Sequence, residues 1–304
     1  MKMKIDKTPA ATPIPLSSDK KEVLINPQEK NKPINPNKNT NTPTSQMQLL
    51  GLARQFVIDG ALLPVEKQMP IEDRAKKRER LNYLRKQQNL EHIIQRAVQY
   101  CSDNEIADRA DQDWFNSFIE LAEDISNKTM QDLWAKILAG EISSPGSFSL
   151  KSLQTFRTLS IHEAKLLAKA CALAVKDQSR KGMRIISGAS QTPGIFNIFS
   201  KNREHKLNLS PFGLSYAELL TLADNHLIFI QETETPPIEK GETLNFHYNG
   251  SNLSITAAKN NCLISFYKFT PTGTELAQLI SDNSDSKYLS LLKSELDGLF
   301  ELSS

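Results

Sequence analysis

Acidic residues around the first tryptophan are the side chains best suited to hold a metal ion. Residues 101–145 contain ten Asp and Glu residues against three Lys and Arg residues. Asp113 and Glu120 are two helical turns apart, so a helix would place both carboxylates on one face, where they could bind a divalent cation. No histidine accompanies them, and Trp114 occupies the adjacent face. We therefore favour a solvated acidic helix, with a metal-dependent nuclease built on this helix as the alternative.

Other residue types that commonly carry catalysis are isolated in this chain. The five histidines form no HxxxH pair and the three cysteines form no CxxC pair, so no zinc site is expected. Segment 188–194 follows a β-like run and holds two glycines, but it lacks the Gly-Lys-Ser/Thr ending of a phosphate loop, and Pro193 removes an amide donor. The sequence predicts no catalytic residue, no metal and no cofactor.

A basic segment, residues 176–206, is the first candidate for binding a partner. Seven Lys and Arg residues stand there against two acidic residues. Cations attract phosphate, and an apolar run at 195–199 could contact a protein or a membrane surface. A basic connector packed between two domains is the favoured interpretation, and nucleic-acid binding comes second. The candidate nucleic-acid or partner residues are Arg180, Lys181, Arg184, Lys201, Arg203 and Lys206.

A second basic region lies in a long helix predicted over 71–101. Its first half, 72–88, has seven basic and three acidic residues and is mostly charged or amide, whereas its second half carries apolar residues at helical spacing. We expect the second half to pack and the first half to project or to meet a partner. Such a charge run is usually a solvated helix face; nucleic acid and a partner helix are the alternatives.

Composition divides the chain into a tail and two folded domains. Residues 1–44 hold seven of the fifteen prolines among Asn, Lys, Thr and Ser, which predicts a disordered tail. Residues 45–177 predict a helical domain whose core is anchored by Trp114 and Trp134, with a turn at 140–146. The helices are predicted at 45–63, 71–101, 104–125, 128–138, 150–159 and 160–174.

Residues 178–304 predict an α+β domain with an antiparallel β-meander. Asn249 and Gly250 favour a hairpin, and the order of helix, hairpin and strand is similar to the end of a winged-helix domain. The fold class is therefore mainly α with an α+β C-terminal part, and fold analogy alone does not establish function. Strands are predicted at 227–231, 244–248, 253–257 and 262–269, and helices at 215–226, 274–280 and 288–302.

The global charge and hydropathy predict a cytoplasmic protein. Thirty-seven basic residues balance 35 acidic ones, so only local patches can attract a polyanion. The basic N-terminus lacks the apolar core of a secretory signal, and no stretch reaches the ~20 apolar residues of a transmembrane helix.

Three runs of sequence resemble a family of bacterial hypothetical proteins classed as a domain of unknown function. The runs are Asp111–Phe115, Met130–Glu141 (MQDLWAKILAGE) and Pro145–Ser149, and the resemblance covers the chain from about residue 70 onwards. The stretch LWAKIL is also similar, more distantly, to helical abortive-infection proteins of phage defence. The family implies a cytoplasmic bacterial protein and supplies no activity. The motif core consists of Asp113, Trp114, Leu133, Trp134, Glu141, Pro145 and Gly146.

These observations favour a non-enzymatic binding or regulatory protein, linked to nucleic acid or to phage defence. The lack of a catalytic set, the local basic patches and the winged-helix-like ending are the reasons. Two alternatives remain open: the nuclease described above, and a helical scaffold that oligomerises through the basic long helix.

Overall fold

The structure is a computed structural model that describes residues 44–101, 111–178, 182–192, 204–248, 250–281 and 285–303. Residues Ala53–Ser304 form one compact unit, and the few described residues before Ala53 belong to another. The predicted tail lies outside the described residues except for Thr44. The predicted division of the folded part at 177/178 stays a prediction.

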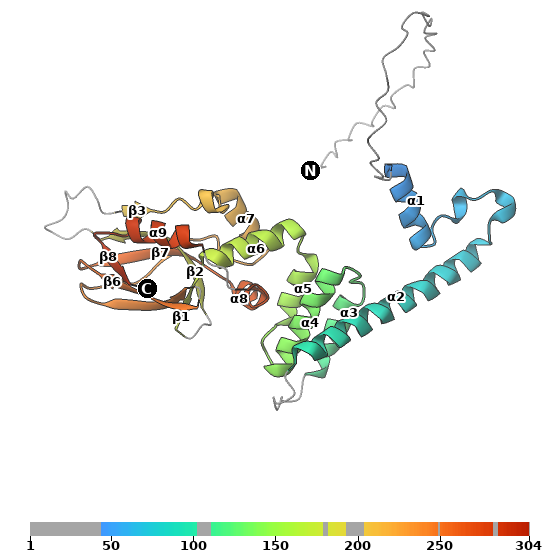
Figure 1. Ribbon diagram of the computed structural model, residues 1–304, viewed down its shortest axis with the longest axis horizontal. Coiled ribbons are helices and arrows are strands. Elements are labelled where there is room, and N and C mark those ends of the chain that lie inside the picture. Colours follow the sequence, from blue (N-terminus) through green and yellow to red (C-terminus); the bar gives the residue numbers. More distant parts are fainter. Residues whose placement is uncertain are drawn as a thin grey trace, which may run out of the picture. The chain divides into compact units, whose positions relative to one another are not determined.

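The first part of the chain is helical, as the sequence predicts (Figure 1). The first helix ends at Gln55 instead of Leu63, because the chain turns at Val57, whose φ is +56°. Two short 3₁₀ turns, Gly60–Leu62 and Val65–Lys67, then lead into the long helix. The α-helices of this part are α1 (Ser45–Gln55), α2 (Ile71–Tyr100), α3 (Gln112–Ala122), α4 (Lys128–Ser143), α5 (Leu150–Thr158) and α6 (Ile161–Leu173).

Side-chain caps explain where several helices begin. The Asp111 carboxylate accepts the backbone N–H of Asp113 at 2.8 Å at the start of α3, and Asn127 caps α4 in the same way. At α6, Ser160 and Glu163 form the predicted capping box, in which each side chain accepts the other residue's backbone N–H. These local signals fix helix starts without tertiary contacts.

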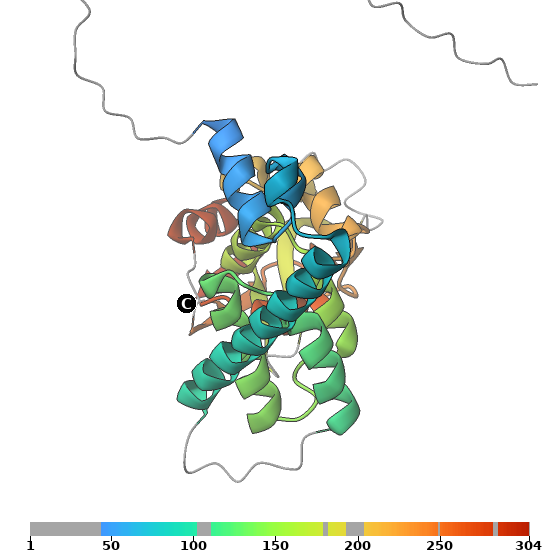
Figure 2. The same ribbon diagram turned by 90° about the vertical axis from the view of Figure 1, so that its right-hand side faces the viewer.

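Aromatic rings fill the core of the helical part. Phe118 lies between the two tryptophans, with ring centroids 5.4 Å from Trp114 and 5.4 Å from Trp134. Phe156 of α5 continues this row at 5.5 Å from Trp134. The second half of α2 packs on α3 and α4 through Ile93 and other buried residues (Figure 2). The tryptophans therefore anchor the helical core through Phe118 and do not stack on each other.

The C-terminal part contains an antiparallel sheet of eight strands in the described ranges, so the predicted α+β class is confirmed. The strand order is β4-β7-β2-β1-β5-β6-β8, with β3 paired to β2. Tyr248 pairs with Ser251 across the predicted hairpin. The strands are β1 (Val175–Asp177), β2 (Met183–Gln191), β3 (Glu204–Lys206), β4 (Thr233–Glu234), β5 (Thr243–Tyr248), β6 (Ser251–Ala257), β7 (Cys262–Lys268) and β8 (Phe300–Ser303).

Several predicted elements of this part are wrong in extent. The predicted 288–302 helix is α9 (Ser286–Glu295) followed by β8, because Gly298 turns the chain at φ +79°. In the predicted 227–231 strand, only Ile228 forms a bridge, to Phe269. The first half of segment 188–194, which the sequence already disfavoured as a phosphate loop, belongs to β2, where a Cβ on Gly188 would lie 2.5 Å from the His205 carbonyl oxygen. That glycine permits close strand pairing.

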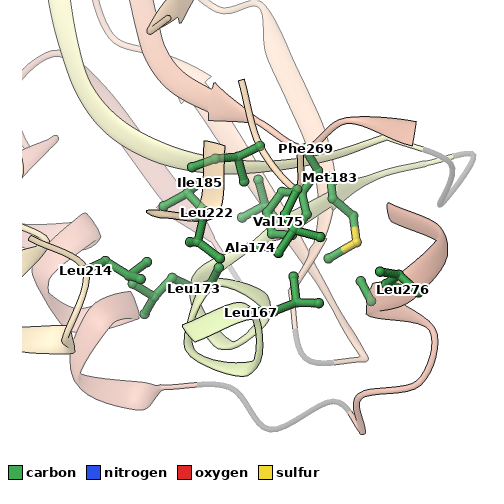
Figure 3. Close-up of a cluster of buried hydrophobic side chains, with 14 of the residues drawn as sticks. Leu167, Leu173, Ala174, Val175, Met183, Ile185, Leu214, Leu222, Phe269 and Leu276 are labelled. Carbon is green, nitrogen blue, oxygen red and sulfur yellow. The ribbon is translucent and has the colours of Figure 1, made fainter. Parts of the chain in front are cut away.

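Helices pack on the sheet around a shared apolar core (Figure 3). The core is contributed by α6, by β1 and β2, and by the helices α7 (Tyr216–Asp224) and α8 (Pro271–Ala277). The buried Tyr288 hydroxyl of α9 donates to the Ile186 carbonyl at 2.8 Å. The hairpin β5–β6 is part of this larger sheet, and the winged-helix similarity stays a prediction.

Candidate nucleic-acid interface

The predicted basic site at 176–206 is only partly described by the structure. Arg180, Lys181, Lys201 and Arg203 lie outside the described residues. Arg184 and Lys206 are both described, but the structure does not bring them together. Lys206 of β3 pairs with Gly188, four residues beyond Arg184 along β2.

Arg184 is engaged with the sheet. Its guanidinium carbon lies 4.9 Å from the ring centroid of Phe266 and 5.5 Å from that of Phe246. Burial lowers the pKa of Arg184, and the neighbouring Asp177 carboxylate raises it. Lys206 is exposed, and its ammonium lies 2.9 Å from Glu204 on the same strand. Neither cation is well placed to serve as an unpaired phosphate contact.

The first half of α2 projects from the folded body. No described residue from Thr44 to Gln88 is buried, and the first buried residue of α2 is Asn89. Residues 71–88 therefore form about 27 Å of helix without a core-facing side chain. Figure 1 shows this half extending beyond α3, α4 and α5. The prediction that the second half packs while the first half projects is confirmed.

Ion pairs and amide hydrogen bonds fix the projecting half at its base. Lys86 bonds Glu123 at the end of α3, and this bond is the main reason that the pKa of Lys86 is raised. Arg85 lies 3.6 Å from Asp124. The buried Asn89 amide donates to the Glu123 carbonyl at 2.8 Å. The acidic end of α3 thus holds the basic helix in place.

Beyond this base, four cations surround the helix. Lys76, Lys77, Arg78 and Arg80 are exposed, and none forms an ion pair with a residue that the structure describes. Tyr83 lies one turn after Arg80 on the same face and is 65% exposed. This charge run is visible in the sequence, but segment 176–206 is the stronger candidate there, because charge runs on helices are usually solvated.

The acidic helix shows no metal centre in the described ranges. No group of three His, Cys, Asp or Glu side chains is placed there to hold an ion. Asp113 and Glu120 are exposed, while Asp111 caps α3. Similarly, none of the described helices is long and apolar enough to cross a membrane.

Three of the motif residues, Trp114, Glu141 and Gly146, hold the turn between α4 and α5 in place. The Trp114 indole N–H donates to the Phe148 carbonyl at 2.6 Å, and the buried Glu141 carboxylate accepts the backbone N–H groups of Gly146 and Phe148. Gly146 has φ +86°, and the Phe148 ring packs 3.0 Å from where a Cβ on Gly140 would lie. This packing explains why α4 continues through Gly140 to Ser143, where the sequence predicted a turn.

Glu275 of α8 connects the C-terminal part to the start of α5, and the sequence did not indicate this contact. One oxygen of its carboxylate accepts bonds from the Ser149 N–H at 2.7 Å, from the Ser149 hydroxyl at 2.9 Å and from the Ser152 hydroxyl. It thereby caps α5 from α8. Its partners lie more than 120 residues away, so no local pattern indicates the contact.

A family model described as a protein of unknown function, DUF2806, matches residues 73–293. The chain belongs to the DUF2806 family. No curated protein and no solved structure matches the chain. The DUF2806 match begins at Asp73, inside the first turn of α2, so it includes the four exposed cations and leaves out residues 53–72.

Proposed function

We propose that this DUF2806 protein is a non-enzymatic nucleic-acid-binding protein that uses the first half of α2. The observation that carries the proposal is the set of four exposed cations, Lys76, Lys77, Arg78 and Arg80, on a helix half with no buried side chain. Because these cations pair with none of the described residues, they are available to replace the counterions of phosphates. The cytoplasmic location predicted from the sequence is part of this proposal.

The shape of the projecting half suits a nucleic-acid groove. The major groove of a DNA duplex is about 12 Å wide and admits one α-helix. The about 27 Å of projecting helix is comparable to the ~34 Å of one duplex turn. Exposed Tyr83 adds an aromatic face on which an unpaired base can stack. Duplex and single-stranded ligands are therefore both included in the test.

The alternative of a metal-dependent nuclease has less support. Glu123 and Asp124 are engaged by Lys86 and Arg85, and Asp111 caps α3. The remaining pair, Asp113 and Glu120, would need a third ligand that none of the described residues supplies. Incubation of the protein with nucleic acid and Mg²⁺ or Mn²⁺ distinguishes the two readings, because the binding proposal expects the nucleic acid to stay intact.

The test is a comparison of three charge-matched variants in fluorescence anisotropy. Labelled duplex of about 20 base pairs, two helical turns, and a single strand of equal length serve as ligands. The first variant replaces Lys76, Lys77, Arg78 and Arg80 with Gln, which preserves helix propensity. The second replaces the exposed Lys240, Lys259, Lys268 and Lys287 with Gln, an equal loss of charge on the C-terminal part. The third replaces Arg180, Lys181, Lys201 and Arg203.

The proposal expects the first variant to weaken binding at low salt by at least about tenfold. The second should stay within about twofold of the original protein. If the original protein binds neither ligand at low salt, or if the first two variants lose equal affinity, the proposal is wrong. A selective loss in the third variant would move the site to the 176–206 segment.

A further inference from the structure

The segment that leads into α2 exposes seven large apolar side chains within sixteen residues. We define the arm as residues 56–71. Seven of its large apolar side chains are between 41% and 81% exposed, Val57 is half-buried, and none of its residues is buried. Exposed apolar patches larger than a few hundred Å² usually mark interaction sites. The exposed side chains are Phe56, Ile58, Leu62, Leu63, Val65, Met69 and Ile71.

The arm is held in a defined conformation by local bonds. It contains two 3₁₀ turns, and the Gln68 side-chain amide donates to the Leu63 carbonyl at 2.7 Å. The Arg85 guanidinium lies 4.9 Å from the centre of the Phe56 ring, which attaches the arm to α2. The apolar side chains are therefore presented on an ordered surface.

The size of this surface fits a protein interface. The seven side chains together expose on the order of 700 Å², close to the ~800 Å² that each partner buries in a standard interface. The arm holds two acidic residues, Asp59 and Glu66, against one basic residue, Lys67, and Arg54 beside the arm lies 3.9 Å from Asp59. The arm thus has no charge surplus that would attract a polyanion or an anionic lipid surface.

The arrangement of charge is complementary to itself. Glu66 and Lys67 are adjacent, exposed and near the middle of the apolar series, and neither forms an ion pair with another described residue. In an interface with twofold symmetry, if residue i contacts residue j, then j also contacts i. Two copies of the arm can therefore place each Glu66 beside the opposite Lys67 while the surrounding apolar side chains are buried.

We propose that the arm binds the arm of a second copy of this chain and forms a twofold dimer. Glu66 of each copy faces Lys67 of the other, and the apolar side chains on both sides provide most of the buried area. This inference does not depend on nucleic-acid binding, because it uses none of the four cations of α2. It goes beyond the proposed function because it assigns a partner to residues 56–71, which lie before the part of the chain that the family model matches.

The first test measures mass against concentration by light scattering and sedimentation on the full chain, after removal of nucleic acid at high salt. The original protein should be a dimer that dissociates on dilution. Replacement of Leu62 and Val65 with Asp should raise the dimer Kd at least about tenfold, because the charges would be buried in the interface. Ile161→Asp is the matched control: Ile161 is 75% exposed at the start of α6, where an acidic residue is tolerated.

The second test is a charge exchange that only self-association explains. Glu66→Lys and Lys67→Glu, each alone, should weaken the dimer, because like charges would then face each other. The double exchange E66K/K67E should restore it, because the pairing is recreated in reverse. Restoration by the double exchange is not expected for an unrelated partner or for a lipid surface.

Two results overturn the proposal. One is a monomer at every concentration. The other is a dimer whose Kd is the same in the original protein, in the variant with Leu62 and Val65 replaced by Asp, and in Ile161→Asp. Binding to vesicles of phosphatidylserine and phosphatidylcholine is measured as well. A monomer that binds these vesicles through Leu62 and Val65 would assign the surface to lipid instead. The Lys76, Lys77, Arg78 and Arg80 variant should remain dimeric, so failure of this proposal and failure of nucleic-acid binding are separate outcomes.

Discussion

Glu141 holds Phe148 in place: one carboxylate oxygen accepts the Phe148 backbone N–H at 2.8 Å, and the other accepts the N–H of Gly146 at 2.7 Å. Glu141 is itself buried, at 6% exposure. The turn between α4 and α5 is thus built around a charged side chain of the preceding helix. Glu141 and Gly146, two of the motif residues, thus shape this turn.

Glu141→Ala should destabilise the protein by about 1–3 kcal/mol, because the buried Phe148 N–H and the Gly146 N–H lose a charged acceptor. The measurement is urea unfolding followed by circular dichroism. Glu120→Ala, at an exposed position of α3, is the control and should change the free energy of unfolding by less than ~0.5 kcal/mol. Equal effects of the two changes would contradict the role assigned to Glu141.

Glu275 should couple α8 to the start of α5. In a double-mutant cycle, Glu275→Ala and Ser152→Ala should show a coupling energy of about 0.5–3 kcal/mol, because the carboxylate accepts the Ser152 hydroxyl. Arg157, exposed in the last turn of α5, gives a control cycle with Glu275 that tests for nonspecific effects. Strict additivity for the Ser152 pair would show that the contact contributes no stability.

Acid should remove the contribution of the bond between Tyr100 and Asp132. The Tyr100 hydroxyl donates to Asp132 at 2.6 Å and is the main cause of the lowered pKa of Asp132; Lys136 and Arg96 lower it further. A folded-state pKa below the unfolded value of about 3.9 stabilises the protein above that pH, and the stability is lost as pH falls through the folded pKa. Tyr100→Phe should therefore reduce stability at neutral pH and have a smaller effect once the pH has fallen below the folded-state pKa of Asp132. An effect that is equal at both pH values would contradict this linkage.

Local patterns in the sequence predicted the parts of the fold that local interactions determine. The capping box at Ser160 and Glu163, the long helix and the β5–β6 hairpin are confirmed, since their signals lie within a few residues. Gly140 was misread as a turn because its role is contact with a ring eight residues away. Short strands such as β1, β3 and β8 depend on pairing with distant strands, and their three or four residues carry too little periodicity to be recognised.

In the candidate site, too, the local features were visible in the sequence and the long-range contacts were not. The basic run in α2 is visible in the sequence as charge. Whether its cations are exposed and unpaired depends on which residues of the helix are buried. It also depends on the acidic partners Glu123 and Asp124, whose ion pairs among the described residues are with Lys86 and Arg85. In the sequence Arg184 cannot be told apart from the other cations of 176–206, because its two aromatic neighbours come from strands far along the chain. Charge is readable from a sequence, whereas exposure and pairing are not.

The salt dependence of nucleic-acid affinity tests the central claim most directly. For duplex DNA, the logarithm of the binding constant falls with the logarithm of salt concentration by about 0.9 per phosphate contact. Loss of Lys76, Lys77, Arg78 and Arg80 should therefore make the slope shallower by about 3–4, while the variant of Lys240, Lys259, Lys268 and Lys287 should keep the original slope. Equal slopes in the original protein and in the α2 variant would contradict the claim that this helix binds the phosphates.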